Sequence, residues 1–158
     1  MSNLIFYLIT FLMSTTMTVK SPAFKHNETI PDKYTCQGQS INPEIDIEGI
    51  PEKTKTLALI MDDPDAPNGT FDHWVMWNIP RAPMIAENSA PGKQGKNGKH
   101  ENKYTGPCPP SGTHHYHFNV YALDSELSLG ADADKSALEK AMEGHILAKA
   151  EMIGLYKK

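Results

Sequence analysis

The chain has 158 residues, of which 39% are hydrophobic and 22% charged, and its formal net charge is −4 at pH 7. This length predicts one domain that needs neither a metal nor a disulfide scaffold to fold. The mildly acidic balance gives no electrostatic footprint for nucleic acid. Two cysteines, Cys36 and Cys108, allow at most one disulfide bond. The unusual counts are twelve prolines and seven histidines, and three of those histidines lie within residues 114–117.

The amino terminus begins with an apolar stretch in which nine of the ten residues 4–13 are apolar. A membrane-spanning helix needs about 20 residues, whereas a stretch of this length is typical of a secretion signal. No Lys or Arg precedes it, and the only small-residue cleavage pattern, Ser14-x-Thr16, is weak. The alternative is an over-extended start, with translation beginning at Met13 or Met17. Residues 1–17 are therefore separated from a single domain over 18–158.

The two interpretations of this segment place the protein in different compartments. A signal peptide makes the protein periplasmic or secreted, where Cys36 and Cys108 can pair. That bond would close a loop of about 70 residues and stabilise the fold by about 4 kcal/mol. Without a signal the protein is cytoplasmic and both residues are thiols.

Short apolar runs separated by Pro, Gly and Asn predict a β-rich fold. Residues 57–61 and 74–79 are nearly continuous apolar runs, as expected for central strands covered on both faces. Residues 116–123 alternate instead: Tyr116 and Phe118 share one face, with His117 and Asn119 on the other. This pattern predicts a third strand.

Residues 63–67, Asp-Pro-Asp-Ala-Pro, follow the first of these strands directly. The prolines keep the backbone extended, so Asp63 and Asp65 are expected to project to one side. Two carboxylates that close need a cationic or hydrogen-bonding partner, or one of them has a raised pKa. The plainer interpretation is a turn with solvated carboxylates. His73 stands at the mouth of the next strand and by itself decides nothing.

Two glycine-rich segments differ in character. Residues 92–100 repeat Gly-Lys three times but lack the Ser/Thr-ended pattern of a phosphate loop, which favours a flexible basic surface loop. Residues 104–117 combine prolines and glycines with three histidines, so a rigid loop leads into the strand at 116. Peptide N–H groups in such a loop can cradle an anion. His114 and Tyr116 share a face there, whereas His115 and His117 are expected on the half-exposed surface.

One segment predicts a helix. Ser136 and Glu139 have the spacing of a capping box, and apolar residues follow at helical spacing as far as Ile153. Gly154 would then end the helix. His145 lies on the apolar stripe of this helix and is expected to be a hydrogen-bonded core residue.

Three blocks together resemble the signature of the phosphatidylethanolamine-binding proteins, with the closest likeness to the bacterial Raf-kinase-inhibitor-like branch. They are DPDAP at 63–67, HWVMWNIP at 73–80 and YTGPCPPSGTHHY at 104–116. Residues 33–45 and 141–156 are also similar to that branch. The resemblance implies a mainly β fold with a large central antiparallel sheet, a smaller sheet and a few peripheral helices, one near the C-terminus. It also implies a small pocket that binds phosphate or the phosphoryl end of phosphatidylethanolamine.

The resemblance further implies which residues surround that pocket. Cys108 and the Pro109 region would form a wall, and the Ala66–Pro67 peptide bond would be cis, at a cost of about 0.5–1 kcal/mol. His115 stands where many relatives have arginine, and Asn42-Pro43 replaces a common Ser-Pro, so a partner surface near His115 does not carry over. The implied ligand-binding set is Asp63, Asp65, His73, Cys108, Pro110, His114 and Tyr116.

A binding hypothesis follows from this set. His73 and His114, partly protonated, supply positive charge and Tyr116 donates a hydrogen bond, while Asp63 and Asp65 orient the imidazoles and raise their pKa. Binding would then strengthen as the pH falls through the histidine range. We expect a small anionic or phosphorylated ligand, no catalytic residue, metal or cofactor, no nucleic acid and no transmembrane span. A protein partner or a homodimer is compatible with the sequence.

The alternative from another class is a hydrolase that uses the same pocket. It would hold a metal with His73, His114 and Asp63, or use Cys108 as a thiol nucleophile with His114 as base. A third interpretation is a regulator that docks a protein partner at the pocket. The sequence alone does not choose the ligand among a lipid head group, a nucleotide and a free anion.

Overall fold

The computed structural model describes residues 16–158, so the predicted signal segment or extended start lies almost entirely outside the described residues. The elements are β1 (Thr18–Lys20), β2 (Glu28–Thr29), the 3-10 helix η1 (Asp32–Tyr34), β3 (Ile45–Glu48), β4 (Thr56–Asp63), β5 (Phe71–Pro80), β6 (Met84–Ile85), β7 (Lys93–Gln94), β8 (Thr113–Leu123), α1 (Lys135–Met142) and β9 (Ile146–Lys157). The expectation of a mainly β fold with a large and a small sheet is confirmed.

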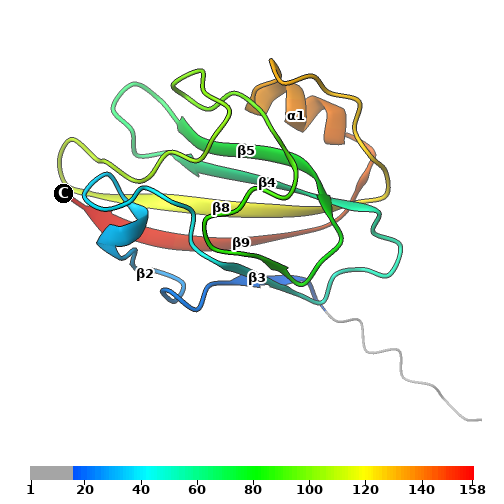
Figure 1. The fold of residues 1–158 in the computed structure, drawn as a ribbon, viewed down its shortest axis with the longest axis horizontal. Helices are drawn as coiled ribbons and strands as arrows, with labels where there is room; N and C mark the ends of the chain where they lie inside the picture. Colours follow the sequence, from blue (N-terminus) through cyan, green and yellow to red (C-terminus); the bar gives the residue numbers. More distant parts are fainter. Residues whose placement is uncertain (1–15) are drawn as a thin grey trace, which may run out of the picture.

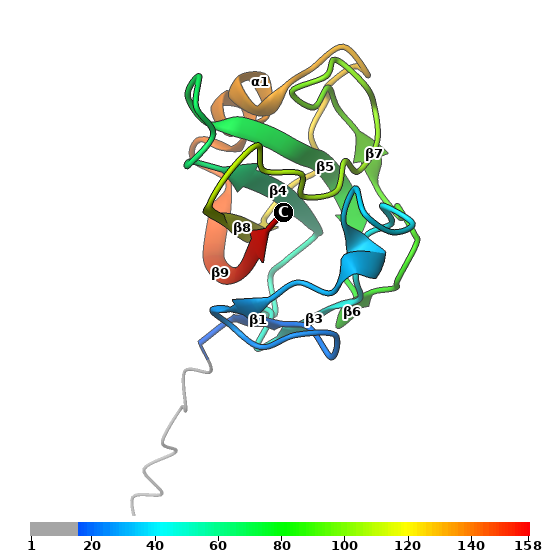
Figure 2. The same ribbon diagram turned by 90° about the vertical axis from the view of Figure 1, so that its left-hand side faces the viewer.

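The strands form two sheets, shown in Figure 1 and, turned by 90°, in Figure 2. The large sheet has the order β2-β9-β8-β4-β5-β7, and the small one has the order β1-β3-β6. In the large sheet, neighbouring strands are antiparallel except β2 and β9, which are parallel. In Figure 2 the small sheet lies below the large one and α1 lies above it. The large sheet is therefore the middle layer of the molecule.

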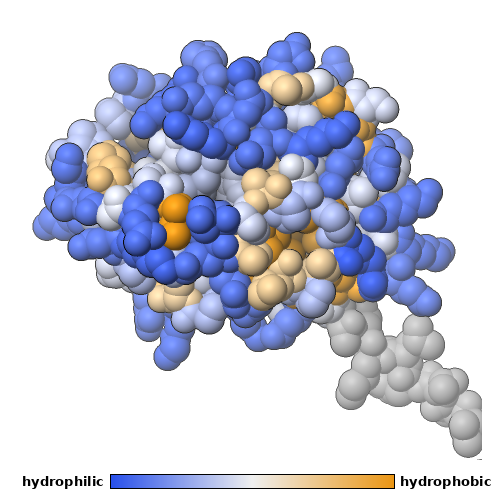
Figure 3. Space-filling view, in the orientation of Figure 1, coloured by the Kyte–Doolittle hydropathy of each residue, from blue (hydrophilic) through white to orange (hydrophobic). Residues whose placement is uncertain are grey.

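The central strands β4 and β5 are buried on both faces, as their continuous apolar runs predict. Leu59 and Met61 face a core between the two sheets, and Ala58 and Ile60 face a second core. The second core is closed by Leu138 of α1. Most apolar side chains are thus inside, and the face in Figure 3 is largely hydrophilic with small apolar patches. Within residues 16–158 no helix is long and apolar enough to cross a membrane.

The predicted C-terminal helix is wrong beyond residue 142. The helix begins at Lys135 after Asp134, whose carboxylate accepts the Ala137 N–H at 2.9 Å, so Ser136 is not the cap. Gly144 follows with a φ of 78°, a value that favours glycine. From Ile146 the chain is a strand that pairs with the whole of β8.

The helical spacing hid a period of two within this segment. Met152, Gly154 and Tyr156 are buried, and the residues between them are more exposed. Gly154 is not a helix cap, because it lies inside β9, where an added Cβ would stand 2.5 Å from the Ile30 side chain. His145 is not a core residue either. It lies half-exposed in the turn before β9, with its Nδ1 2.8 Å from Asp124 Oδ1.

The basic segment 92–100 is anchored rather than free. Its first part forms β7 against Met76 and Trp77, and Gly95 N donates to Val75 O at 2.9 Å. Asn97 is buried, its Oδ1 accepts the N–H groups of Lys99 and Glu101, and its amide group donates to Lys103 O and Thr105 Oγ1. The tertiary fold therefore fixes the position of Lys99.

Candidate functional site

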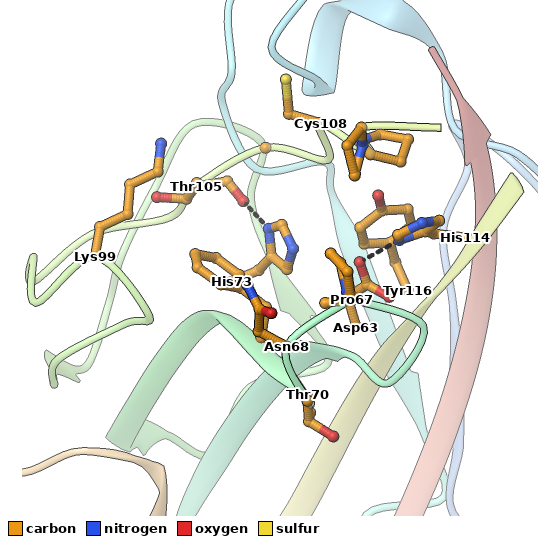
Figure 4. A pocket seen from close by; sticks show the side chains of 16 residues that line it. Asp63, Pro67, Asn68, Thr70, His73, Lys99, Thr105, Cys108, His114 and Tyr116 are labelled. Atoms are coloured by element: carbon orange, nitrogen blue, oxygen red, sulfur yellow. Dashed lines mark hydrogen bonds and ion pairs between the residues drawn. The ribbon is translucent and has the colours of Figure 1, made fainter. Parts of the chain in front are cut away.

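A pocket of about 370 Å³ lies at one end of the large sheet. β4 ends at Asp63, and its two antiparallel neighbours, β5 and β8, begin at Phe71 and Thr113. The side chains that end one strand and begin the other two therefore converge, as Figure 4 shows. The pocket is lined by Asp63, Ala66, Pro67, Asn68, Gly69, Thr70, Phe71, His73, Lys99, Thr105, Gly106, Cys108, Pro109, Pro110, His114 and Tyr116.

Asp63 and His114 form a buried pair on one side of the pocket. His114 Nδ1 lies 2.7 Å from Asp63 Oδ2, and both residues are less than a tenth exposed. The other carboxylate oxygen, Oδ1, accepts the backbone N–H of Asp65 at 2.9 Å. Both oxygens of Asp63 are thus occupied by protein donors. The carboxylate fixes the ring of His114 and leaves its Nε2 for the pocket.

His73 is held on the opposite side by the backbone. Its Nδ1 lies 2.7 Å from Thr105 O, and its carbonyl accepts the Thr105 N–H at 2.9 Å. A carbonyl oxygen only accepts, so Nδ1 carries the proton and Nε2 is free. Burial lowers the pKa of His73. This corrects the expectation that His73 is partly protonated. The carboxylate of Asp63 contacts His114 instead of His73, and the cost of burying a charged imidazole outweighs the more distant attraction between Asp63 and the His73 ring.

Tyr116 lies between the two histidines. Its ring meets that of His73 edge-on, with centroids 5.2 Å apart, and stacks near that of His114 at 6.4 Å. Burial, together with the nearby Asp63 carboxylate, raises the pKa of Tyr116, so its hydroxyl keeps its proton. Within residues 16–158 this buried hydroxyl donates to no protein group, and the Cys108 backbone N–H is directed at its oxygen. It is therefore a donor available to a ligand.

Asp65 lies outside the pocket, although the resemblance places it among the ligand contacts. Its Oδ2 accepts from His115 Nδ1 at 2.7 Å and from the His115 backbone N–H at 2.8 Å, on the exposed side of the loop. These hydrogen bonds lower the pKa of Asp65. The two carboxylates of DPDAP thus diverge, because Asp63 still belongs to β4 and Asp65 does not. Asp65 orients His115 rather than a pocket histidine.

The pocket wall of residues 104–110 is fixed from the side of η1. Tyr104 Oη donates to Tyr34 O at 2.8 Å, and Gly106 N donates to Ser40 Oγ at 3.0 Å. Cys108 forms a disulfide with Cys36, and Cys36 N donates to Pro107 O at 3.0 Å. A thiol at Cys108 is therefore not present in this state. Both half-cystines are exposed.

The peptide bond before Pro67 is not cis, because no residue from 16 to 158 follows a cis peptide bond. The expectation of a cis bond is thus wrong. The loop 64–70 reaches the pocket with the trans isomer, which is the lower in free energy by about 0.5–1 kcal/mol for X-Pro bonds.

Several lining residues lie outside the predicted set, among them Lys99, Thr105 and Phe71. Lys99 is the one Lys or Arg among the residues that line the pocket. Its signal was the Gly98-Lys99 pair, but only the fold shows that Gly98 lies against the Phe71 ring, where a Cβ would stand 2.6 Å from a ring carbon. Thr105 contributes its carbonyl oxygen, which no side-chain pattern reveals. His117 lies outside the pocket and pairs with Glu151 at 3.0 Å.

Fold and site together define a two-sheet β protein whose central sheet ends in a histidine-lined pocket. The phosphatidylethanolamine-binding protein family model matches residues 20–157, and the chain belongs to this family. The UPF0098 protein of Pyrococcus horikoshii is 49% identical over 149 residues, which cover 87% of this chain and 75% of that protein.

Two solved structures are similar to the whole domain. A phosphatidylethanolamine-binding protein homologue of Chlamydia trachomatis has a TM-score of 0.88 at 39% identity, covering 90% of this chain and 98% of the other. YbcL of Escherichia coli, described as a member of the mammalian family, has a TM-score of 0.84 at 26% identity, covering 91% of this chain and 99% of the other. The expected family is thus confirmed, with both bacterial and Pyrococcus relatives.

Proposed function

We propose that this protein is a binding protein whose pocket takes a small ligand through a phosphoryl group, such as phosphate or a phospholipid head group. One observation carries the proposal: three polar groups converge on one pocket, and none of them is hydrogen-bonded to another side chain of residues 16–158. They are Nε2 of His73, Nε2 of His114 and the hydroxyl of Tyr116. Lys99 supplies a positive charge at the rim. Buried polar groups left without partners are costly, so a polar ligand would satisfy them.

Several apolar side chains also line the pocket, which supports a ligand larger than a bare anion. Phe71, Pro67 and Pro110 line it beside the polar groups. Ligand sites commonly combine such apolar walls with a few placed polar groups. A ligand with an organic group attached to its phosphoryl group would use both halves.

The proposal is tested by calorimetry with inorganic phosphate and phosphoethanolamine. We expect binding by the native chain and at least a tenfold loss in both His114→Ala and Tyr116→Phe. His117→Ala is the matched control, because His117 lies on the same strand but outside the pocket. Equal affinities in all four proteins, or no binding by the native chain, would contradict the proposal.

A hydrolase at the same pocket receives less support. The thiol route needs a free Cys108, whose sulfur is bonded to Cys36. For the metal route, Asp63 would have to bind the ion while both its oxygens accept protein hydrogen bonds. No group of three or more His, Cys, Asp or Glu side chains from 16 to 158 is arranged to hold a metal. We therefore propose a binding protein and no enzyme. The same site is compatible with a protein partner that binds at the pocket when it holds a ligand.

A further inference from the structure

The structure also bears on which phosphoryl ligands fit, an inference that rests on the proposed function. His73 has a hydrogen-bond partner at Nδ1, and none at Nε2 within residues 16–158. Thr105 O accepts a hydrogen bond from Nδ1–H, no carboxylate of residues 16–158 is hydrogen-bonded to the ring, and His73 is 5% exposed. Burial without a carboxylate partner disfavours the charged imidazolium, and a neutral ring that donates from Nδ1 has a lone pair at Nε2.

The free Nε2 points across the pocket toward Tyr116 and His114 (Figure 4). A fully deprotonated oxygen placed there would face a lone pair, whereas a P–OH group would donate to it. We propose that the pocket selects a phosphoryl group that keeps one proton, that is, a phosphomonoester or hydrogen phosphate as its monoanion, over a phosphodiester or a sulfo group. Of the ligands in the proposed function, this favours phosphate and the free head group phosphoethanolamine over an intact phospholipid, which is a phosphodiester. The P–OH group keeps its proton and donates a hydrogen bond to Nε2 of His73, and the charged oxygens of the ligand accept a hydrogen bond from the hydroxyl of Tyr116.

The charged and titratable groups around His73 agree with this arrangement. Each oxygen of Asp63 already accepts a hydrogen bond from the protein, whereas Nε2 of His73 accepts none from residues 16–158. Positive charge from Lys99 disfavours an imidazolium at His73 and favours an anionic ligand. The facing groups are Asp62 and Asp63 of β4, His114 and Tyr116 of β8, and Lys99 of the 92–100 segment.

The test compares probes of similar shape and equal charge. At roughly pH 6, methylphosphonate is largely a monoanion with one P–OH, whereas methanesulfonate and dimethyl phosphate are monoanions with none. We expect methylphosphonate to bind at least tenfold more tightly than either of the others. Equal affinities would overturn the proton requirement and leave the proposed function standing. No binding of any probe, of phosphate or of phosphoethanolamine would overturn both.

Two further measurements distinguish the role of His73 in ligand binding from its structural contact with Thr105. His73→Asn keeps an N–H that can reach Thr105 O but removes the Nε2 acceptor. We expect it to keep the fold, as judged by circular dichroism, and to bind the three probes with equal affinity. Nitrogen NMR of the native chain with methylphosphonate bound should show His73 neutral. An imidazolium in that complex would overturn the proposal. Tighter binding of phosphoethanolamine than of phosphate would identify a phosphomonoester, and not free phosphate, as the preferred ligand.

Discussion

His114 donates its Nδ1–H to Asp63 across 2.7 Å in a buried pair that joins the start of β8 to the end of β4. The same contact orients a pocket histidine and ties together two neighbouring strands. Asp65, two residues along, makes a similar contact with His115 on the exposed side. The two pairs therefore form a natural comparison between a buried and an exposed interaction.

Asp63→Asn should lower the free energy of unfolding by about 2–3 kcal/mol, because it removes a charged hydrogen-bond acceptor from a buried site. Asp65→Asn should cost less than about 1 kcal/mol, since exposed ion pairs contribute little. Urea denaturation of the two variants measures the difference. Equal losses would show that burial of the Asp63 pair has no energetic consequence.

Stability should depend on pH through His73. Its pKa is lowered in the folded state, so between that value and 6.5 the unfolded chain binds more protons. The free energy of unfolding therefore falls as the pH drops below 6.5, and this contribution is fully present above that pH. The stability gap between the native chain and His73→Asn should narrow from about pH 7 to about pH 5. A gap that widens on acidification would contradict the lowered pKa.

The Cys36–Cys108 disulfide should stabilise the fold substantially. It joins residues 72 apart in sequence, and closing a loop of that length is worth about 4 kcal/mol in the chain-entropy model. Cys36→Ser, Cys108→Ser and the double variant should all lose the same amount in urea denaturation, because each removes the same bond. Addition of a dithiol reductant should bring the native chain to the same level. Additive losses in the double variant would point to separate packing roles instead.

Substitution of Gly106 in the pocket wall should reduce both stability and phosphate affinity. A Cβ there would stand 2.6 Å from Tyr34 O and 2.7 Å from Ser40 Oγ. Gly106→Ala must therefore shift the wall, at a cost of about 1–3 kcal/mol, and phosphate affinity should fall with it. Gly130→Ala is the matched control, because its Cβ would meet only the mobile end of Asp132. Unchanged phosphate affinity in Gly106→Ala would show that the wall does not shape the site.

Lys99 should contribute to anion affinity through charge. Lys99→Ala is expected to weaken phosphate binding several-fold at low ionic strength and less at high salt, because salt screens an exposed charge. Lys53→Ala, an exposed lysine away from the pocket, should leave the affinity unchanged. An equal salt dependence of phosphate binding in the native chain and in Lys99→Ala would remove Lys99 from the site.

Much of the fold was predictable because its signals are local. The continuous apolar runs of β4 and β5 predict strands buried on both faces, and the alternation around Phe118 predicts β8. The segment after Met142 was mispredicted because small and apolar residues fit both a helical period and a period of two. Pairing with β8 along its length decides for the strand, and that pairing is a long-range interaction.

The family, the two proline-rich loops and the residue types of the site follow from the amino-acid sequence alone. Which of these side chains meet depends on the folded arrangement. Asp63 belongs to β4 and faces His114, whereas Asp65 turns to the surface. The carbonyl of Thr105 sets the tautomer of His73, and Asn97 places Lys99 at the pocket. Burial, tautomer and charge depend on neighbours distant in sequence, so no local pattern specifies them.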